Sequence, residues 1–154
     1  MGYTNYYKVE APISKDIFGK ASKDLIKVIK QRKIRVAGGD GTGDPQLNSD
    51  GLVFNGFEDE SYETFLLTAS GGDGWFCKTN RLPYDLIVKS ALLLLRHHGA
   101  NIDFECDDCN IGDGEELSST ELWVEAAEAC EEALGYSAGS LLASPSTKET
   151  VTSE

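Results

Sequence analysis

The densest group of chemically active side chains lies in residues 75–86, WFCKTNRLPYDL. Lys78, Thr79 and Arg81 stand between an expected strand and an expected helix that has Pro83 in its first turn. A helix N-terminus presents unpaired N–H groups and the positive end of its dipole. Because two cations and a hydroxyl stand at this end, the stretch predicts a site for a phosphate or carboxylate.

Aromatic and acidic residues complete this candidate site. Trp75 and Tyr84 would offer rings on which a planar base stacks. The expected ligand-binding residues are therefore Tyr3, Glu63, Trp75, Lys78, Thr79, Arg81, Tyr84 and Asp85. An alternative interpretation stays open, in which Lys78 and Arg81 pair with acids such as Glu63 and Asp85 in a structural ion network.

A second glycine-rich stretch, residues 38–42 (GGDGT), is typical of the phosphate-binding turn of lipid and NAD kinases. In such kinases a helix follows the turn and points its N-terminus at the phosphates. Here Gly43, Asp44, Pro45 and the segment 48–51 (NSDG) follow, which are turn-forming residues. We therefore expect a turn-rich connection rather than a kinase site.

The cysteines do not predict a metal site or a cofactor. Cys106 and Cys109 have the spacing of half a zinc site, but the sequence holds no second pair of this kind. An EF-hand counted from Asp108 would place Asp113 where glycine is needed. Small buried thiols are the simpler interpretation. The adjacent His97 and His98 precede Gly99, where imidazoles are expected to cap the carbonyls at a helix end.

Composition and charge restrict the function. The chain has 154 residues, 40% of them hydrophobic, and a net charge of −12. Residues 1–36 carry nine cations and three acids, a balance of +6, whereas residues 37–154 carry 5 − 23 = −18. This acidity disfavours direct nucleic-acid binding. The longest apolar run, 91–95, is too short to span a bilayer. Four cysteines without a signal-peptide pattern predict a cytoplasmic protein with reduced thiols.

Periodicity and turn residues predict a single α+β domain over residues 1–136, followed by a flexible Ser/Thr-rich tail over 137–154. Its sheet is expected to be mostly antiparallel and packed with three helices. The expected order β-α-β-β-β-β-α-β-α places strands at 2–9, 34–37, 52–57, 62–68, 75–79 and 102–106, and helices at about 14–32, 83–98 and 118–135.

Four motifs occur in the same order as in a family of small phage and bacterial proteins that the chain resembles. They are residues 1–6 (MGYTNY), 54–56 (FNG), 62–65 (YETF) and 76–86 (FCKTNRLPYDL), and the resemblance covers residues 1–136. Asn80 replaces the family's alanine, and residues 105–108 (ECDD) replace its Ser-Asp-Gly turn. The resemblance implies a phage setting, hence the host cytoplasm, but no particular activity.

These observations favour a binding module over an enzyme. The first hypothesis is a sponge that sequesters a small, anionic, nucleotide-derived signal of host immunity. The second is an acidic mimic of nucleic acid that masks a host protein. The third is a hydrolase in which Glu63 or Asp85 acts as general base beside Lys78. No metal and no cofactor are expected, and self-association of the chain stays an open alternative.

Overall fold

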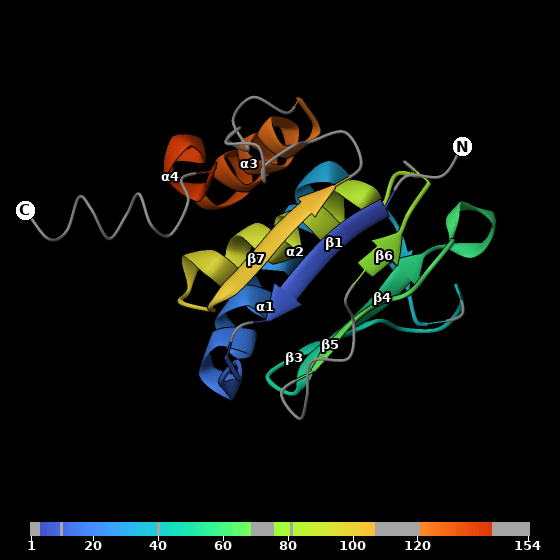
Figure 1. The fold of residues 1–154 in the computed structure, drawn as a ribbon. Coiled ribbons are helices and arrows are strands. Elements are labelled where there is room, and N and C mark those ends of the chain that lie inside the picture. The colour runs from blue at the N-terminus through green and yellow to red at the C-terminus, as the bar shows by residue number, and fades with distance from the viewer. Residues whose placement is uncertain are drawn as a thin grey trace, which may run out of the picture.

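The computed structural model describes residues 4–9, 11–39, 41–68, 76–80, 82–106 and 121–142 (Figure 1). Its elements are, in order, β1 (Thr4–Val9), α1 (Lys15–Arg32), β2 (Val36–Ala37), β3 (Gln46–Asn48), β4 (Gly51–Gly56), the 3-10 helix η1 (Glu58–Glu60), β5 (Phe65–Thr68), β6 (Phe76–Lys78), α2 (Asp85–His97), β7 (Ile102–Cys106), α3 (Glu121–Leu134) and α4 (Ala138–Leu142). The mixture of helices with antiparallel strands confirms the predicted α+β class.

The strands form two antiparallel sheets. One has the order β6-β1-β7, so the N-terminal strand lies at its centre. In the other, β4 pairs with β2, β3 and β5. Helix α2 contacts the β6-β1-β7 sheet, and α1 packs on α2 and on β3 and β4 of the other sheet. The helices lie behind the β6-β1-β7 sheet in Figure 1, and the described helices leave its opposite face uncovered. This sheet therefore has an inner face toward the helices and an outer face.

Helix α1 forms as its sequence predicts. The Ser14 hydroxyl accepts a hydrogen bond from the Ile17 N–H at 3.2 Å and caps the N-terminus. Lys33 ends the helix in the left-handed conformation, with φ of 57°. Buried residues recur along one face of the helix at Phe18, Ala21, Leu25 and Val28. This apolar stripe docks α1 on the core and leaves its lysines in solvent.

Helix α2 runs through the centre of the domain. All nine residues from Ile87 to Leu95 are buried, including the short apolar run 91–95. Trp123 of α3 is fully buried as well. Gly99 provides the predicted left-handed end, with φ of +112°. Within the described ranges no helix combines the length and the hydrophobicity that crossing a membrane requires.

Two short elements differ from the prediction. Residues 46–48, expected as part of a turn, form β3 and pair with β4. Residues 138–142, expected as part of a flexible tail, form α4, whose Leu141 and Leu142 are buried. The Ser137 hydroxyl accepts a hydrogen bond from the Ser140 N–H and caps α4, and the two leucines complete the core. The folded domain therefore reaches Leu142, and residues 143–154 of the expected tail lie outside the described residues.

The motif 54–56 has a clear structural part. Phe54 is in the core, and the Asn55 Oδ1 accepts hydrogen bonds from the N–H groups of Gly56 and Tyr62 at 2.7 and 2.9 Å. A Cβ on Gly56 would collide with the Glu60 carbonyl oxygen, so the chain needs glycine there. These contacts fix the bend that leads from β4 toward Glu63.

Candidate functional site

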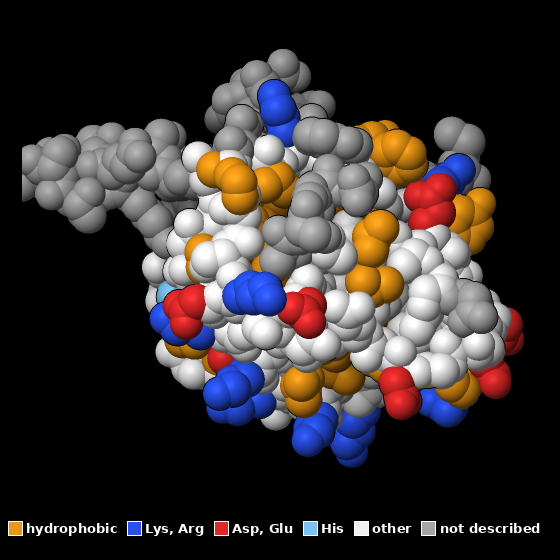
Figure 2. Space-filling view, turned by 90° about the horizontal axis from the view of Figure 1, so that it is seen from below, with side chains coloured by type: hydrophobic (Ala, Val, Ile, Leu, Met, Phe, Trp, Pro, Cys, Tyr) orange, Lys and Arg blue, Asp and Glu red, His pale blue; other side chains and the backbone are white. Residues whose placement is uncertain are grey.

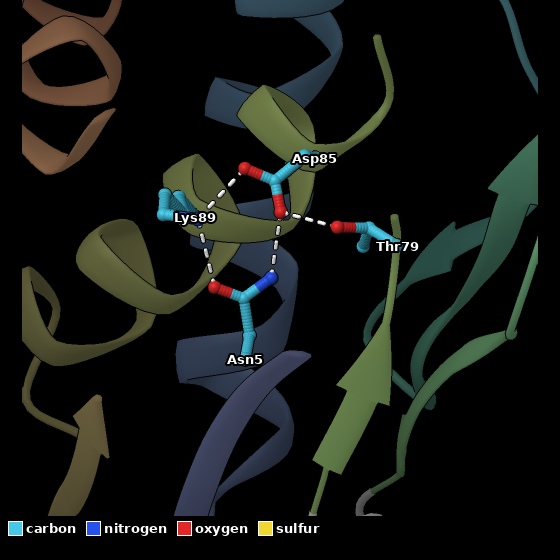
Figure 3. Close-up of polar contacts among 4 residues, drawn as sticks. All are labelled: Asn5, Thr79, Asp85 and Lys89. Carbon is cyan, nitrogen blue, oxygen red and sulfur yellow. Dashed lines mark hydrogen bonds and ion pairs between the residues drawn. The ribbon is translucent and has the colours of Figure 1, made fainter. Parts of the chain in front are cut away.

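A buried polar network occupies the corner between β6 and α2 (Figure 3). The Asp85 carboxylate accepts hydrogen bonds from Asn5 Nδ2 at 2.8 Å and from Thr79 Oγ1 at 2.6 Å. Lys89 Nζ donates to the other Asp85 oxygen at 2.7 Å and to Asn5 Oδ1 at 2.9 Å. The network therefore joins three elements that are distant in sequence, β1, the end of β6 and α2.

The burial of this network decides what it can do. Asn5, Thr79 and Lys89 are fully buried, and Asp85 is 5% exposed. A buried ion pair persists only where hydrogen bonds satisfy the remaining polar atoms, and here Asn5 and Thr79 supply them. Thr79 and Asp85, expected as ligand-binding residues, thus position the corner from inside rather than face solvent.

Glu63 and Tyr84 attach β6 to the second sheet. Glu63 Oε1 accepts a hydrogen bond from the Lys78 N–H at 2.6 Å, and the Glu63 N–H donates to the Lys78 carbonyl at 3.1 Å. The Tyr84 hydroxyl, buried beneath, donates to the Glu63 carbonyl at 2.6 Å. Burial raises the pKa of Tyr84 well above its ordinary value, so the hydroxyl stays a donor. Both residues fix the position of Lys78.

The expected cradle of free N–H groups at the start of α2 is not formed. The Asp85 N–H donates to the Leu82 carbonyl at 2.8 Å, and the Leu86 N–H donates to the Pro83 carbonyl at 3.4 Å. The next N–H, of Ile87, donates to the Tyr84 carbonyl at 3.0 Å. Because the turn before α2 supplies acceptors for its own first donors, an anion near this corner would depend on side chains instead.

The outer face of the β6-β1-β7 sheet carries exposed aromatic rings. Tyr6 of β1 lies opposite Phe76 of β6 in the register, and they are 41% and 56% exposed. Lys78, two residues beyond Phe76, shares this face. Its ammonium lies 5.8 Å from the centre of the Tyr62 ring, which is 49% exposed. Lys78 therefore shares this face with the exposed rings of Tyr6 and Phe76 and lies near a third exposed ring, that of Tyr62.

Of the eight predicted site residues, the structure brings five into one corner. Glu63, Lys78, Thr79, Tyr84 and Asp85 are linked there by the contacts above, and of these only Glu63 and Lys78 reach the surface. The other three, Tyr3, Trp75 and Arg81, lie outside the described residues.

Sequence reasoning missed Tyr6 and Phe76. The available signal was the alternation along β1, in which Asn5 and Tyr7 point inward and Tyr6 and Lys8 point outward. An outward tyrosine on the central strand marks a surface that can take part in binding.

The GGDGT turn is folded on itself. The Gly38 N–H donates to the carbonyls of Thr42 and Gly43, both at 3.1 Å, and the Gly41 N–H donates to the Gly38 carbonyl at 3.0 Å. The chain continues into β3 rather than into a helix. The expected turn is therefore present at its start, whereas residues 46–48 of the expected connection form a strand.

The described thiols are free and buried. Burial, with a smaller contribution from Glu63 and Asp85, raises the pKa of Cys77 from 9.0 to about 12. Burial likewise raises the pKa of Cys130 to about 11. Such thiols are poor nucleophiles because the thiolate is the reactive form. Among the residues that the structure describes, no group of three or more potential metal ligands comes together. The Cys106–Cys109 pair extends outside them.

The two histidines at the end of α2 bind side chains rather than helix carbonyls. His98 Nε2 lies 2.6 Å from Asp24 Oδ2 of α1, which also accepts a hydrogen bond from the Tyr136 hydroxyl at 2.8 Å. The His97 ring packs on the Tyr136 ring, with centres 4.2 Å apart. Since α1, α2 and the segment after α3 meet here, this cluster joins helices.

No protein-family model, curated protein or solved structure matches this chain. The family resemblance drawn from the four motifs therefore stays a prediction.

Proposed function

We propose that the protein is a binding module for a small, anionic, nucleotide-like ligand, which it holds on the outer face of the β6-β1-β7 sheet. The observation that carries this proposal is the cross-strand pair Tyr6 and Phe76, exposed beside Lys78. Stacking a base on an aromatic side chain contributes about 1–3 kcal/mol. A lysine beside the rings adds attraction for a phosphate.

The charges on this face favour one orientation of the bound ligand. In the described residues, neither Lys78 nor the outward-facing Lys8 makes an ion pair with a carboxylate. The anionic end of a ligand is therefore favoured at Lys78, with its base over Tyr6 and Phe76.

Binding without conversion is the better-supported form of this function. A hydrolase would need a carboxylate available as general base. Glu63 already accepts the Lys78 N–H, and both oxygens of Asp85 take hydrogen bonds inside the buried network. With both candidate bases engaged, sequestration of a nucleotide-derived signal is the role that we propose for the binding.

Retention from a nucleotide extract tests this proposal without assuming the ligand. The purified chain is mixed with a cell nucleotide extract, separated by gel filtration, and the retained small molecules are identified by mass spectrometry. We expect an unaltered nucleotide. A converted nucleotide would make the protein an enzyme, and failure to retain any nucleotide would contradict the binding module and favour the acidic mimic of nucleic acid.

Variants then locate the site. We expect Phe76→Ser and Lys78→Ala each to weaken binding by about tenfold, the equivalent of about 1.4 kcal/mol. Lys20→Ala is the matched control, because Lys20 lies on α1 in an exposed pair with Asp16. Calorimetric titration of wild type and variants measures the change. Equal binding by all four proteins would place the ligand elsewhere.

A further inference from the structure

A second surface lies on the other side of the molecule, between the second half of α1 and the segment that contains the GGDGT turn. It is a groove of about 430 Å³. We call it the α1 groove and define it by six apolar residues that line it: Ile26, Ile29, Ile34, Val36, Leu47 and Phe57. Its volume lies in the range of about 300–1,000 Å³ that is typical of binding pockets.

The α1 groove exposes apolar side chains to solvent. Ile26 is 37% exposed, and Ile29, Ile34, Val36 and Leu47 are only partly buried and pack on the core from one side. An exposed apolar concavity that polar groups surround is typical of an interaction site. No described part of the chain covers these apolar side chains, so the groove is open to a binding partner.

The charged residues that line the groove are two cations and one acid, Asp44. Lys30 and Arg35 line the groove, and the Arg35 guanidinium stacks on the Phe57 ring at 3.7 Å. Lys23 is a neighbour of Ile26 on the same helix, since residues three and four apart are adjacent on its surface. Along the lower edge of the view in Figure 2, Lys and Arg side chains alternate with apolar patches and with some acidic side chains.

The cations at the groove form no ion pair within the part of the chain that the structure describes, although Asp44 lines the same groove. Lys15 and Lys20 of α1 pair with Asp50 and Asp16, and Arg32 pairs with Glu132. By contrast, Lys23, Lys27, Lys30 and Arg35 make no ion pair with a described carboxylate. Part of the positive charge of the N-terminal region, +6 over residues 1–36, therefore lies at the groove without a partner carboxylate in an ion pair.

We infer that the α1 groove binds an acidic, amphipathic segment of a partner protein. Its apolar side chains would fill the groove, as in helix-in-groove recognition, and its carboxylates would meet Lys30 and Arg35. Charge complementarity selects this occupant. A nucleic acid would bring phosphates but few apolar groups, and an anionic bilayer is flat.

Peptide selection against the full chain tests this inference. A random library of peptides of about 15 residues, roughly four helical turns, is selected for binding to the wild-type protein. Binders retained by the variant Ile26→Glu are discarded. We expect the enriched peptides to carry aspartate or glutamate between apolar residues spaced three and four apart. No enrichment, or enrichment of basic peptides, would overturn the inference.

Titration of one fluorescent enriched peptide measures the contribution of charge. Lys30→Glu should weaken binding by at least about tenfold, because it replaces an attractive charge at the groove with a repulsive one. Lys20→Glu, the same change on the same helix outside the groove, should leave affinity within about twofold. If both substitutions weakened binding equally, the peptide would be held by nonspecific charge attraction. That result would contradict the α1 groove as the binding site.

A vesicle assay distinguishes a membrane from a peptide. Sedimentation with vesicles of phosphatidylcholine and phosphatidylserine should leave the protein in the supernatant. If the protein sedimented with the vesicles and Lys30→Glu abolished this, the occupant of the groove would be an anionic bilayer rather than a peptide.

Nucleotide binding at the outer sheet face should be unchanged in Ile26→Glu, so failure of one site is distinguishable from failure of the other.

Discussion

At the residue scale, two ion pairs of identical spacing show how burial changes what a charge does. Asp16–Lys20 and Asp85–Lys89 are both i,i+4 pairs on helices, at 3.1 and 2.7 Å. The first is more than half exposed, whereas the Lys89 side chain is fully buried. Water screens the first pair, while the second exists only because Asn5 and Thr79 complete its hydrogen bonds.

The substitution Asp85→Asn should therefore be strongly destabilising. It removes the carboxylate that faces a buried ammonium, which typically costs about 3–5 kcal/mol of unfolding free energy. Urea unfolding followed by circular dichroism measures this loss. Asp16→Asn is the matched control and should cost only a small fraction of it. The double variant Asp85→Asn/Lys89→Met should recover part of the loss, and equal losses in both single variants would contradict the role of burial.

The sequence predicts part of this residue-scale picture. It identifies Lys78, Glu63, Thr79 and Asp85 as one group, because they are close along the chain or at the ends of neighbouring elements. It does not identify Asn5 as the residue that contacts Asp85, since 80 positions separate them and only the central place of β1 brings them together. A buried polar residue on a strand can be recognised only when it is known which face of that strand points into the core.

At the element scale, the prediction succeeds where the pattern is long. Helix α1 repeats its apolar stripe over five turns and has a serine cap, and α2 ends at a glycine, so both were predicted close to their observed bounds. Strand β3 and helix α4 contain three and five residues, too few for a period to show. Tertiary contacts determine such short elements, so their sequences alone resemble those of a turn or of a flexible tail.

Helix α4 is nevertheless part of the core. Leu141 is 2% exposed, and its carbonyl accepts a hydrogen bond from Arg96 Nη2 of α2 at 2.9 Å. Leu141→Ala should lower the free energy of unfolding by about 2–5 kcal/mol, as for other buried leucines. Ser140→Ala, at an exposed neighbouring position, should have little effect. Thermal unfolding of the two variants measures the difference in stability. If Leu141→Ala left the stability unchanged, α4 would not be part of the core.

At the scale of the whole molecule, the interior holds protons more tightly than the unfolded chain does. Burial raises the pKa of Cys77 to about 12 and that of Cys130 to about 11, from an ordinary value of 9.0. It also raises the pKa of Tyr7 and Tyr84 above their ordinary value of 10.0. These groups lie in the core between the two sheets and the helices, so their protonation is linked to folding.

The protein should accordingly lose stability in alkaline solution. Above about pH 9 the unfolded chain releases these protons while the native state retains them, so each group contributes up to about 1.4 kcal/mol of lost stability per pH unit. The loss should start near the unfolded pKa values and continue toward the native ones, with full stability below pH 9. Urea unfolding at about pH 8 and about pH 10.5 measures the slope. Cys77→Ala, which removes one of the groups, should give a shallower slope than wild type, and an unchanged slope would mean that the Cys77 thiol ionises equally in both states.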